Sequence, residues 1–122
     1  MSEIITPAQV EQRLMQLSGL LEKAQAQLNS AEEQYTTAKA EYEIALAKSR
    51  VALATEVGVN NKLLTATEKE DKALIANETK HLVLASTEIL VKAARANVAH
   101  LKTQVDIARS IGSSVRSSME VN

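Results

Sequence analysis

An apolar residue recurs at alternating steps of four and three in the N-terminal part of the chain, and this repeat constrains the fold most. The resulting N-terminal seam consists of Val10, Leu14, Leu17, Leu21, Ala24, Leu28, Ala31, Tyr35, Ala38, Tyr42 and Ala45. A seven-residue repeat of this kind is typical of a helix that wraps around a partner helix with a left-handed twist. We therefore predict a long helix whose seam is covered by another helix. The large side chains expected in that hairpin or oligomer contact are Leu14, Leu17, Leu21, Leu28, Tyr35 and Tyr42.

Start and stop signals divide the chain into two helical segments. Thr6-Pro7 predicts a helix start, because Thr caps free amides and Pro fits the first helical position. Residues 56–61 (EVGVNN) predict a break, since Gly58 can supply a positive φ and the two asparagines favour a turn. A capping box from Thr65 to Glu68 predicts the second start, with Thr67 to Glu70 as the alternative register.

No further break is expected before the Ser/Gly-containing stretch 110–114 (SIGSS). We expect one helix over about 7–55, a turn over about 56–64 and a second helix over about 65–110. A basic C-terminal segment, 109–122, follows. The predicted fold class is all-α, with residues 1–122 forming a single domain: a long antiparallel helical hairpin with coiled-coil heptads.

The second helix is apolar on more than one face. One face carries Ile75, Leu82, Ile89, Ala93 and Ala96, and the next carries Val83, Leu90, Ala94, Leu101, Val105 and Ala108. A lone hairpin has a single internal seam, and this chain has no Phe or Trp with which to fill it. Such a seam hardly offsets the conformational entropy of the chain. We therefore expect a homo-oligomer of hairpins.

The residues that usually carry catalysis are missing or scattered. There is no cysteine, and His81 and His100 lie too far apart on one helix to share a metal ion. No nucleotide-binding loop or nucleophile elbow is present, so we expect neither an enzyme nor a cofactor. The start of the chain, MSEIITPAQV, does not read as a signal peptide, and the apolar runs are too short to span a membrane. The expected location is the cytoplasm of a bacterial host cell.

Positive charge gathers in the C-terminal part of the chain. Residues 1–91 hold nine Lys/Arg against thirteen Asp/Glu, whereas residues 92–118 hold five against one. Beside Lys92, four of these basic residues recur every seven positions and share a stripe of a continuing helix: Arg95, Lys102, Arg109 and Arg116. A stripe of basic residues with neutral hydrogen-bond donors suits a phosphate backbone. The alternative is a solvated face that complements the helix dipole.

Three stretches match the layout of a known family: YEIALAKSR (42–50), TEKEDK (67–72) and RSIGSSVR (109–116). They resemble the phage UvsY-type recombination mediators, which are small all-helical proteins. That family has a tyrosine and a Lys-x-Arg before a variable loop, then a Lys/Glu-rich helix start and an Arg-Ser-x-Gly-x-x-Ile/Val-Lys/Arg stretch. The resemblance covers roughly residues 35–121, and this chain has fewer aromatic residues and a shorter turn than the family.

The resemblance implies a mediator of homologous recombination that binds single-stranded DNA as a ring-like oligomer. Such a protein helps to displace single-stranded-DNA-binding protein and to assemble a RecA-type recombinase, without a cofactor. By the same resemblance, Lys48 and Arg50 are DNA contacts, and Arg109 and Arg116 lie in the family's C-terminal stretch. The alternative is a coiled-coil assembly or chaperone protein that binds no nucleic acid, either prefoldin-like or a phage morphogenesis scaffold. Prefoldins carry β-hairpins between their helices, for which residues 54–64 are barely long enough.

Overall fold

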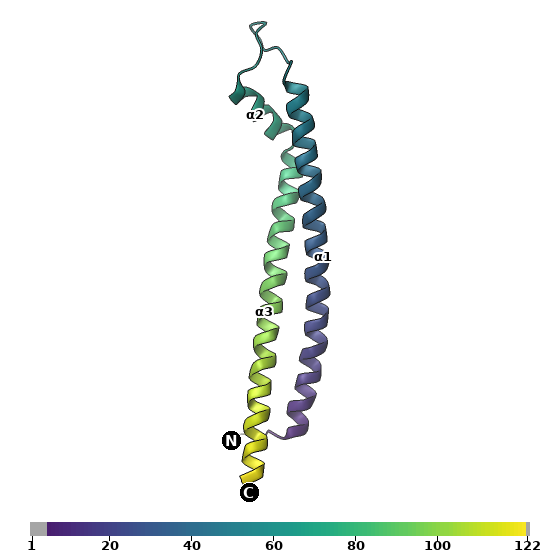
Figure 1. Ribbon diagram of the computed structural model, residues 1–122, viewed down its shortest axis with the longest axis vertical. Coiled ribbons are helices and arrows are strands. Elements are labelled where there is room, and N and C mark those ends of the chain that lie inside the picture. The colour runs from purple at the N-terminus through teal and green to yellow at the C-terminus, as the bar shows by residue number, and fades with distance from the viewer. Residues whose placement is uncertain (1–4, 122) are drawn as a thin grey trace. The chain divides into compact units, whose positions relative to one another are not determined.

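The computed structural model describes residues 5–121, which form three helices in the order α1 (Pro7–Leu53), α2 (Ala66–Ala76) and α3 (Glu78–Val121) (Figure 1). The two long helices, α1 and α3, pack together in a hairpin-like arrangement. The predicted all-α class and the pairing of two long helices are therefore confirmed. Among the described residues, no helix is both long enough and apolar enough to cross a membrane.

Both predicted helix starts are confirmed. At the start of α1, the Gln9 amide donates to Thr6 Oγ1 (3.3 Å), and the Thr6 amide donates to Gln9 Oε1 (2.9 Å). At the start of α2, the Glu68 amide donates to Thr65 Oγ1 (3.2 Å), which is the first of the two registers considered. Helices α1 and α2 thus begin where a threonine side chain satisfies an amide that has no partner within the helix.

The prediction of a single second helix over about 65–110 is wrong at two places, the middle of that helix and its end. Asn77 interrupts it, ending α2 with φ −113° and ψ 20°, while its carbonyl accepts the His81 amide (3.0 Å) as α3 begins. Asparagine favours such breaks because its side chain competes for backbone hydrogen bonds. Beyond residue 110 the helix continues to Val121, and Gly112 is buried inside it. The packing of Gly112 against α1, described below, offsets the poor helix propensity of glycine.

The connection between α1 and α2 is more ordered than a plain turn. Val57 and Leu63 form an isolated antiparallel bridge, and the Gly58 amide donates to the Lys62 carbonyl (2.7 Å). The positive φ was expected at Gly58, but it is found at Asn61 (φ 59°), and no glycine of the chain has one. Asparagine tolerates the left-handed region better than most residues, because its short polar side chain can bond locally.

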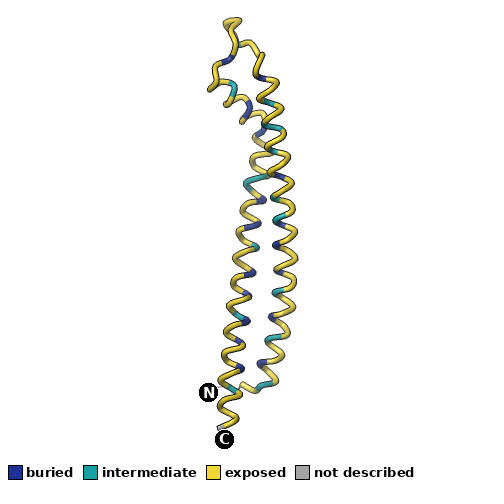
Figure 2. The backbone as a smooth tube through the Cα atoms, in the orientation of Figure 1, coloured by how far each residue is buried: buried dark blue, intermediate teal, exposed yellow. Residues whose placement is uncertain are grey.

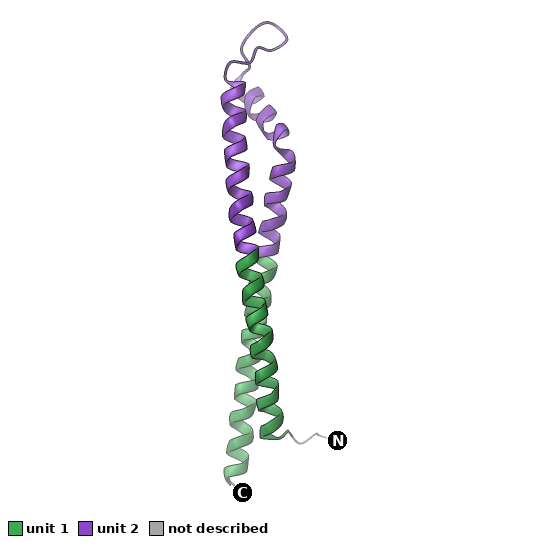
Figure 3. Cartoon of the chain, turned by 90° about the vertical axis from the view of Figure 1, so that its right-hand side faces the viewer, with its two compact units in different colours: residues 1–30, 92–122 green, residues 31–91 purple. Residues whose placement is uncertain are grey.

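The chain divides into two compact units (Figure 3). Unit 1 comprises residues 1–30 and 92–122, and in it the first part of α1 lies antiparallel to the last part of α3. Its core joins a row of α1 to a row of α3, which Figure 2 marks as buried. The buried apolar residues of this unit are Val10, Leu17, Ala24, Leu28, Val98, Leu101, Val105 and Ala108.

Unit 2 comprises residues 31–91 and contains the end of α1, the connection, α2 and the start of α3. A buried cluster in this unit joins Leu53, Leu64 and Ala73, with Leu46 packed against it. Each of these residues comes from the end of α1, the connection or α2, so the short helix α2 is held by apolar contact with α1. Further along α1 in this unit, the buried positions are the small residues Ala31 and Ala38.

The seam of α1 is covered along its length, whereas the faces expected for the second helix are only partly covered. Every residue of the N-terminal seam is buried or half-buried. On α3, the packed row passes through Leu84, Val91 and Val98, which sequence reasoning did not assign to a seam, and joins Leu101, Val105 and Ala108. Of the remaining expected positions, Ala94 is half-buried. The others are exposed: Ile75, Leu82, Val83, Ile89, Leu90, Ala93 and Ala96.

Two glycines give opposite predictions. A Cβ at Gly112 would lie 2.9 Å from Val10 Cγ1, whereas a Cβ at Gly19 meets nothing within 4 Å. Gly19→Ala should therefore raise the free energy of unfolding by about 0.5–1 kcal/mol through helix propensity alone. Gly112→Ala should lower it by about 1 kcal/mol, because overpacking outweighs that gain.

Urea unfolding followed by circular dichroism measures both changes. In a Val10→Ala background, Gly112→Ala should instead raise the free energy of unfolding through helix propensity, since Val10→Ala removes the side chain with which the new Cβ clashes. Equal stabilisation by Gly19→Ala and Gly112→Ala would show that α1 and α3 do not approach closely at this point.

Candidate nucleic-acid interface

The predicted basic stripe lies on α3, because that helix continues to Val121. Its members directly follow the packed positions Ala94, Leu101, Ala108 and Val115, so the stripe borders the contact with α1 in unit 1. All four are exposed: Arg95, Lys102, Arg109 and Arg116. Arg95 and the neighbouring Lys92, also exposed, each interact with other groups of the chain. Arg116 Nε donates to the Gly112 carbonyl (3.3 Å), which orients its guanidinium.

Arg109 and Arg116 share a groove with the start of α1. The groove has a volume of about 270 Å³, and Pro7, Val10 and Leu14 form its apolar wall. Glu11 supplies a carboxylate at the same groove. The groove opens beside the first turn of α1. The positive end of the α1 helix dipole therefore adds to the positive potential of the Arg109 and Arg116 guanidinium groups. Sequence reasoning found both arginines but not the α1 residues that face them.

The charge asymmetry of the sequence follows the two structural units. Unit 1 holds seven Lys/Arg and five Asp/Glu, a net charge of +2, while unit 2 holds seven and ten, a net charge of −3. In unit 1, α3 contributes most of the positive charge, and exposed serines at 110, 113, 114 and 117 lie near it in the sequence. The net charge therefore favours unit 1 over unit 2 as a surface for an anionic ligand.

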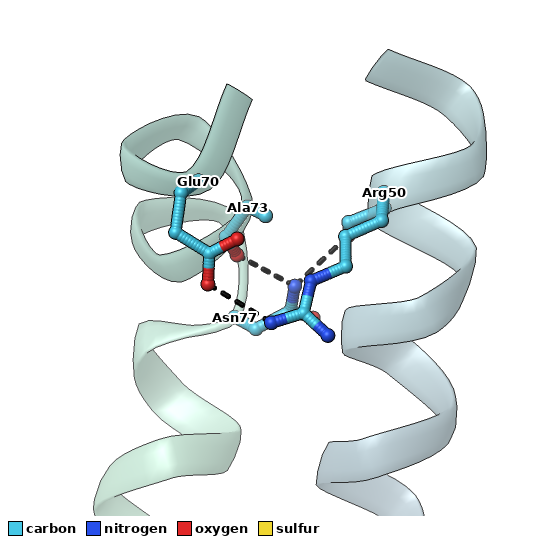
Figure 4. Close-up of polar contacts among 5 residues, drawn as sticks. Arg50, Glu70, Ala73 and Asn77 are labelled. Atoms are coloured by element: carbon cyan, nitrogen blue, oxygen red, sulfur yellow. Dashed lines mark hydrogen bonds and ion pairs between the residues drawn. The ribbon is translucent and has the colours of Figure 1, made fainter. Parts of the chain in front are cut away.

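Lys48 and Arg50, the contacts implied by the family resemblance, lie in unit 2 at the end of α1. Lys48 is exposed. Arg50 Nη2 donates to Glu70 Oε1 of α2 at 2.9 Å (Figure 4), and this hydrogen bond raises the pKa of Arg50. Both side chains of the pair are about half exposed, at 53% and 49%. A phosphate at Arg50 would have to compete with the Glu70 carboxylate.

Asn77 joins α2 to α1 beside this ion pair (Figure 4). Its buried amide donates to Ser49 Oγ of α1 (2.9 Å) and to the Ala73 carbonyl of α2 (2.8 Å). No motif points to Asn77 as a structural residue, although an asparagine inside an apparent helix is a signal for a cap. The junction fixes where α2 meets α1 within unit 2.

The histidines and carboxylates do not form a metal cluster in the part of the chain that the structure describes. No group of three or more His, Cys, Asp or Glu residues within residues 5–121 is arranged to hold a metal ion. The His81 ring instead lies against the Tyr42 ring, with centroids 5.3 Å apart and planes at 49°. Tyr42, like Tyr35, is half-buried.

No family model, no curated protein and no solved structure matches this chain.

Proposed function

We propose that this chain binds single-stranded DNA and acts as a recombination mediator that helps to load a RecA-type recombinase in phage homologous recombination. The observation that carries the DNA-binding part is the exposed basic stripe of unit 1 with its groove at Arg109 and Arg116. Positive side chains at regular intervals suit the evenly spaced phosphates of a strand. The mediator role, with a recombinase and a single-stranded-DNA-binding protein as partners, is supported by the family resemblance.

The proposed mode of binding is electrostatic and independent of base sequence. Base stacking needs exposed aromatic rings, but both tyrosines of this chain are half-buried in unit 2. Affinity should then come from the release of counterions from the DNA, which occurs when the arginines and lysines of α3 neutralise its phosphates. The exposed serines beside them can donate hydrogen bonds to phosphate oxygens without discriminating between bases.

We propose in addition that α1 and α3 form coiled-coil heptads and that the protein acts as a homo-oligomer. The seven-residue spacing of the packed α1 residues supports the first part. Large apolar residues that the single chain leaves exposed, such as Ile44, Val51, Leu82 and Ile89, support the second. An oligomer would also multiply the basic stripes that one strand can contact.

A second candidate is a coiled-coil assembly or chaperone protein, prefoldin-like or a phage scaffold. The observation in its favour is the bridge between Val57 and Leu63, which gives the connection the form of a short hairpin. Val57, Val59 and Leu63 are exposed there and offer apolar side chains to a client protein. In this case the basic stripe would be a solvated face.

A salt titration with a fluorescent oligo-dT distinguishes the candidates. The wild type should bind at low salt, and the logarithm of its affinity should fall linearly with the logarithm of the salt concentration. Replacing Arg109 and Arg116 by Gln should weaken binding and flatten that slope by about 1.4, since each neutralised phosphate contributes about 0.7. Helicity should not change, because both side chains are exposed.

Lys48→Gln with Arg50→Gln is the matched control, as it removes the same charge from unit 2. We expect a smaller effect because Glu70 already neutralises Arg50. A larger effect than that of the Arg109/Arg116 pair would move the interface to the end of α1. A wild type that ignores single strands at low salt would contradict the mediator proposal and favour the assembly protein.

A further inference from the structure

A short stretch of α3 in unit 2 leaves four large apolar side chains exposed. Leu82, Val83, Ile89 and Leu90 retain 58%, 49%, 66% and 52% of their accessible surface. They form two adjacent pairs, one heptad apart, with Ser86 midway between them. Exposed clusters of large apolar side chains mark interaction sites more often than isolated ones do. The exposed surface around Ser86 is called the Ser86 face below.

The Ser86 face is free of charge. At about 100° per residue, Thr79, Leu82, Val83, Ser86, Ile89, Leu90 and Ala93 lie within about 60° of the direction in which Ser86 points. Glu78, at the start of α3, lies about 80° away at the edge of the face. Lys80 and Lys92 lie about 120° away on either side, and Glu88 is on the opposite side of the helix. A partner can therefore cover this face without taking an ionised group out of water.

The arrangement of the face is symmetric about Ser86. Large apolar residues stand at three and four positions before Ser86 and at three and four positions after it. The small residues Thr79 and Ala93 stand seven positions away on either side. A two-fold axis brings residue i of one copy against residue j of the other and j against i, so a surface of this kind complements itself.

We propose that a second copy of this chain covers the Ser86 face, with the two α3 helices antiparallel about a two-fold axis at Ser86. Leu82 of one copy then packs against Leu90 of the other, and Val83 packs against Ile89. The two serines meet at the axis, where small side chains let the helices approach closely. The Ser86 hydroxyl donates to the Leu82 carbonyl of its own helix (2.9 Å), so its donor has a partner when water is excluded.

This contact rests on the self-association in the proposed function, and it gives that association a surface and a symmetry. It does not depend on DNA, and every measurement that tests it is made without DNA. A failure of the contact is therefore distinguishable from a failure of the DNA-binding proposal.

Single cysteines test the geometry directly, because the chain contains none. Ser86→Cys should give a disulfide-linked dimer as the main product of mild oxidation, since the cysteine at position 86 of one chain faces position 86 of the other chain across the axis. Thr79→Cys and Ala93→Cys should each remain largely unlinked alone and should form a linked dimer when the two variants are mixed. Lys80→Cys, exposed on the same helix but pointing away from the face, is the control.

Light scattering of Leu82→Glu provides the second measurement. Its helical circular dichroism should match that of the wild type, since position 82 is exposed in the single chain. The molecular mass of the complex in solution should fall.

Self-linking of Thr79→Cys and of Ala93→Cys would mean a parallel contact and would overturn the proposal. Linking at Ser86 no greater than at Lys80 would overturn it as well. In that case, a monomeric wild type would also refute the homo-oligomer, whereas an oligomeric one would place the contact elsewhere.

Discussion

Replacing Leu17 by Asp should lower the free energy of unfolding by about 3–5 kcal/mol, enough to melt unit 1. Leu17 is 1% exposed and is the largest fully buried side chain among the described residues. The substitution removes a leucine from the contact between α1 and α3 and leaves a carboxylate without a partner in its place. Thermal unfolding followed by circular dichroism measures the loss.

Leu20→Asp is the matched control, one turn along α1 in the same unit. Leu20 is 46% exposed, so the same change of residue type leaves the carboxylate in water. It should change the free energy of unfolding by less than about 1 kcal/mol. Equal losses at the two positions would show that burial in the seam does not determine the stability of unit 1.

Asn77→Ala should lower the free energy of unfolding by about 2 kcal/mol. The variant loses the hydrogen bonds to Ser49 Oγ and to the Ala73 carbonyl, and Ala73 is fully buried, so its carbonyl is left without this donor. The expected result is a lower melting temperature and faster proteolysis within residues 54–77, since α2 is no longer tied to α1.

Ser49→Ala separates the two hydrogen bonds of Asn77. It removes the contact to α1 and leaves the one to Ala73, so the expected loss is about 1 kcal/mol. A wild-type melting curve for Asn77→Ala would show that the buried amide contributes nothing to the junction. In that case the apolar cluster of Leu53, Leu64 and Ala73 alone would hold α2.

The long-range pattern of this fold could be predicted from the sequence, because it depends on repetition. The N-terminal seam repeats over many turns, and each added turn strengthens the same periodic signal. The caps at Thr6 and Thr65 could be predicted as well, since a threonine at a helix start acts through neighbours in the sequence. Local chemistry and long periodicity were therefore sufficient for the helix starts and for the pairing of two helices.

The positions that could not be predicted are those decided by a distant partner. Gly112 was expected to end a helix, yet the helix passes through it because its missing side chain makes room for Val10. Asn77 breaks a helix where its amide reaches Ser49, which lies far away in the sequence. The groove at Arg109 and Arg116 was likewise hidden, since its other wall is supplied by the start of α1.

The division into units implies an order of folding. Unit 2 is one continuous stretch, residues 31–91, whereas unit 1 joins the two ends of the chain. Forming unit 1 first would require closing a long loop, and the entropy of loop closure grows with loop length. Helices α1 and α3 each continue from unit 2 into unit 1. Once unit 2 has formed, their segments in unit 1 can therefore pack together turn by turn without that entropic cost. During synthesis, residues 7–30 therefore remain without their partner until the ribosome has made residues 92–121.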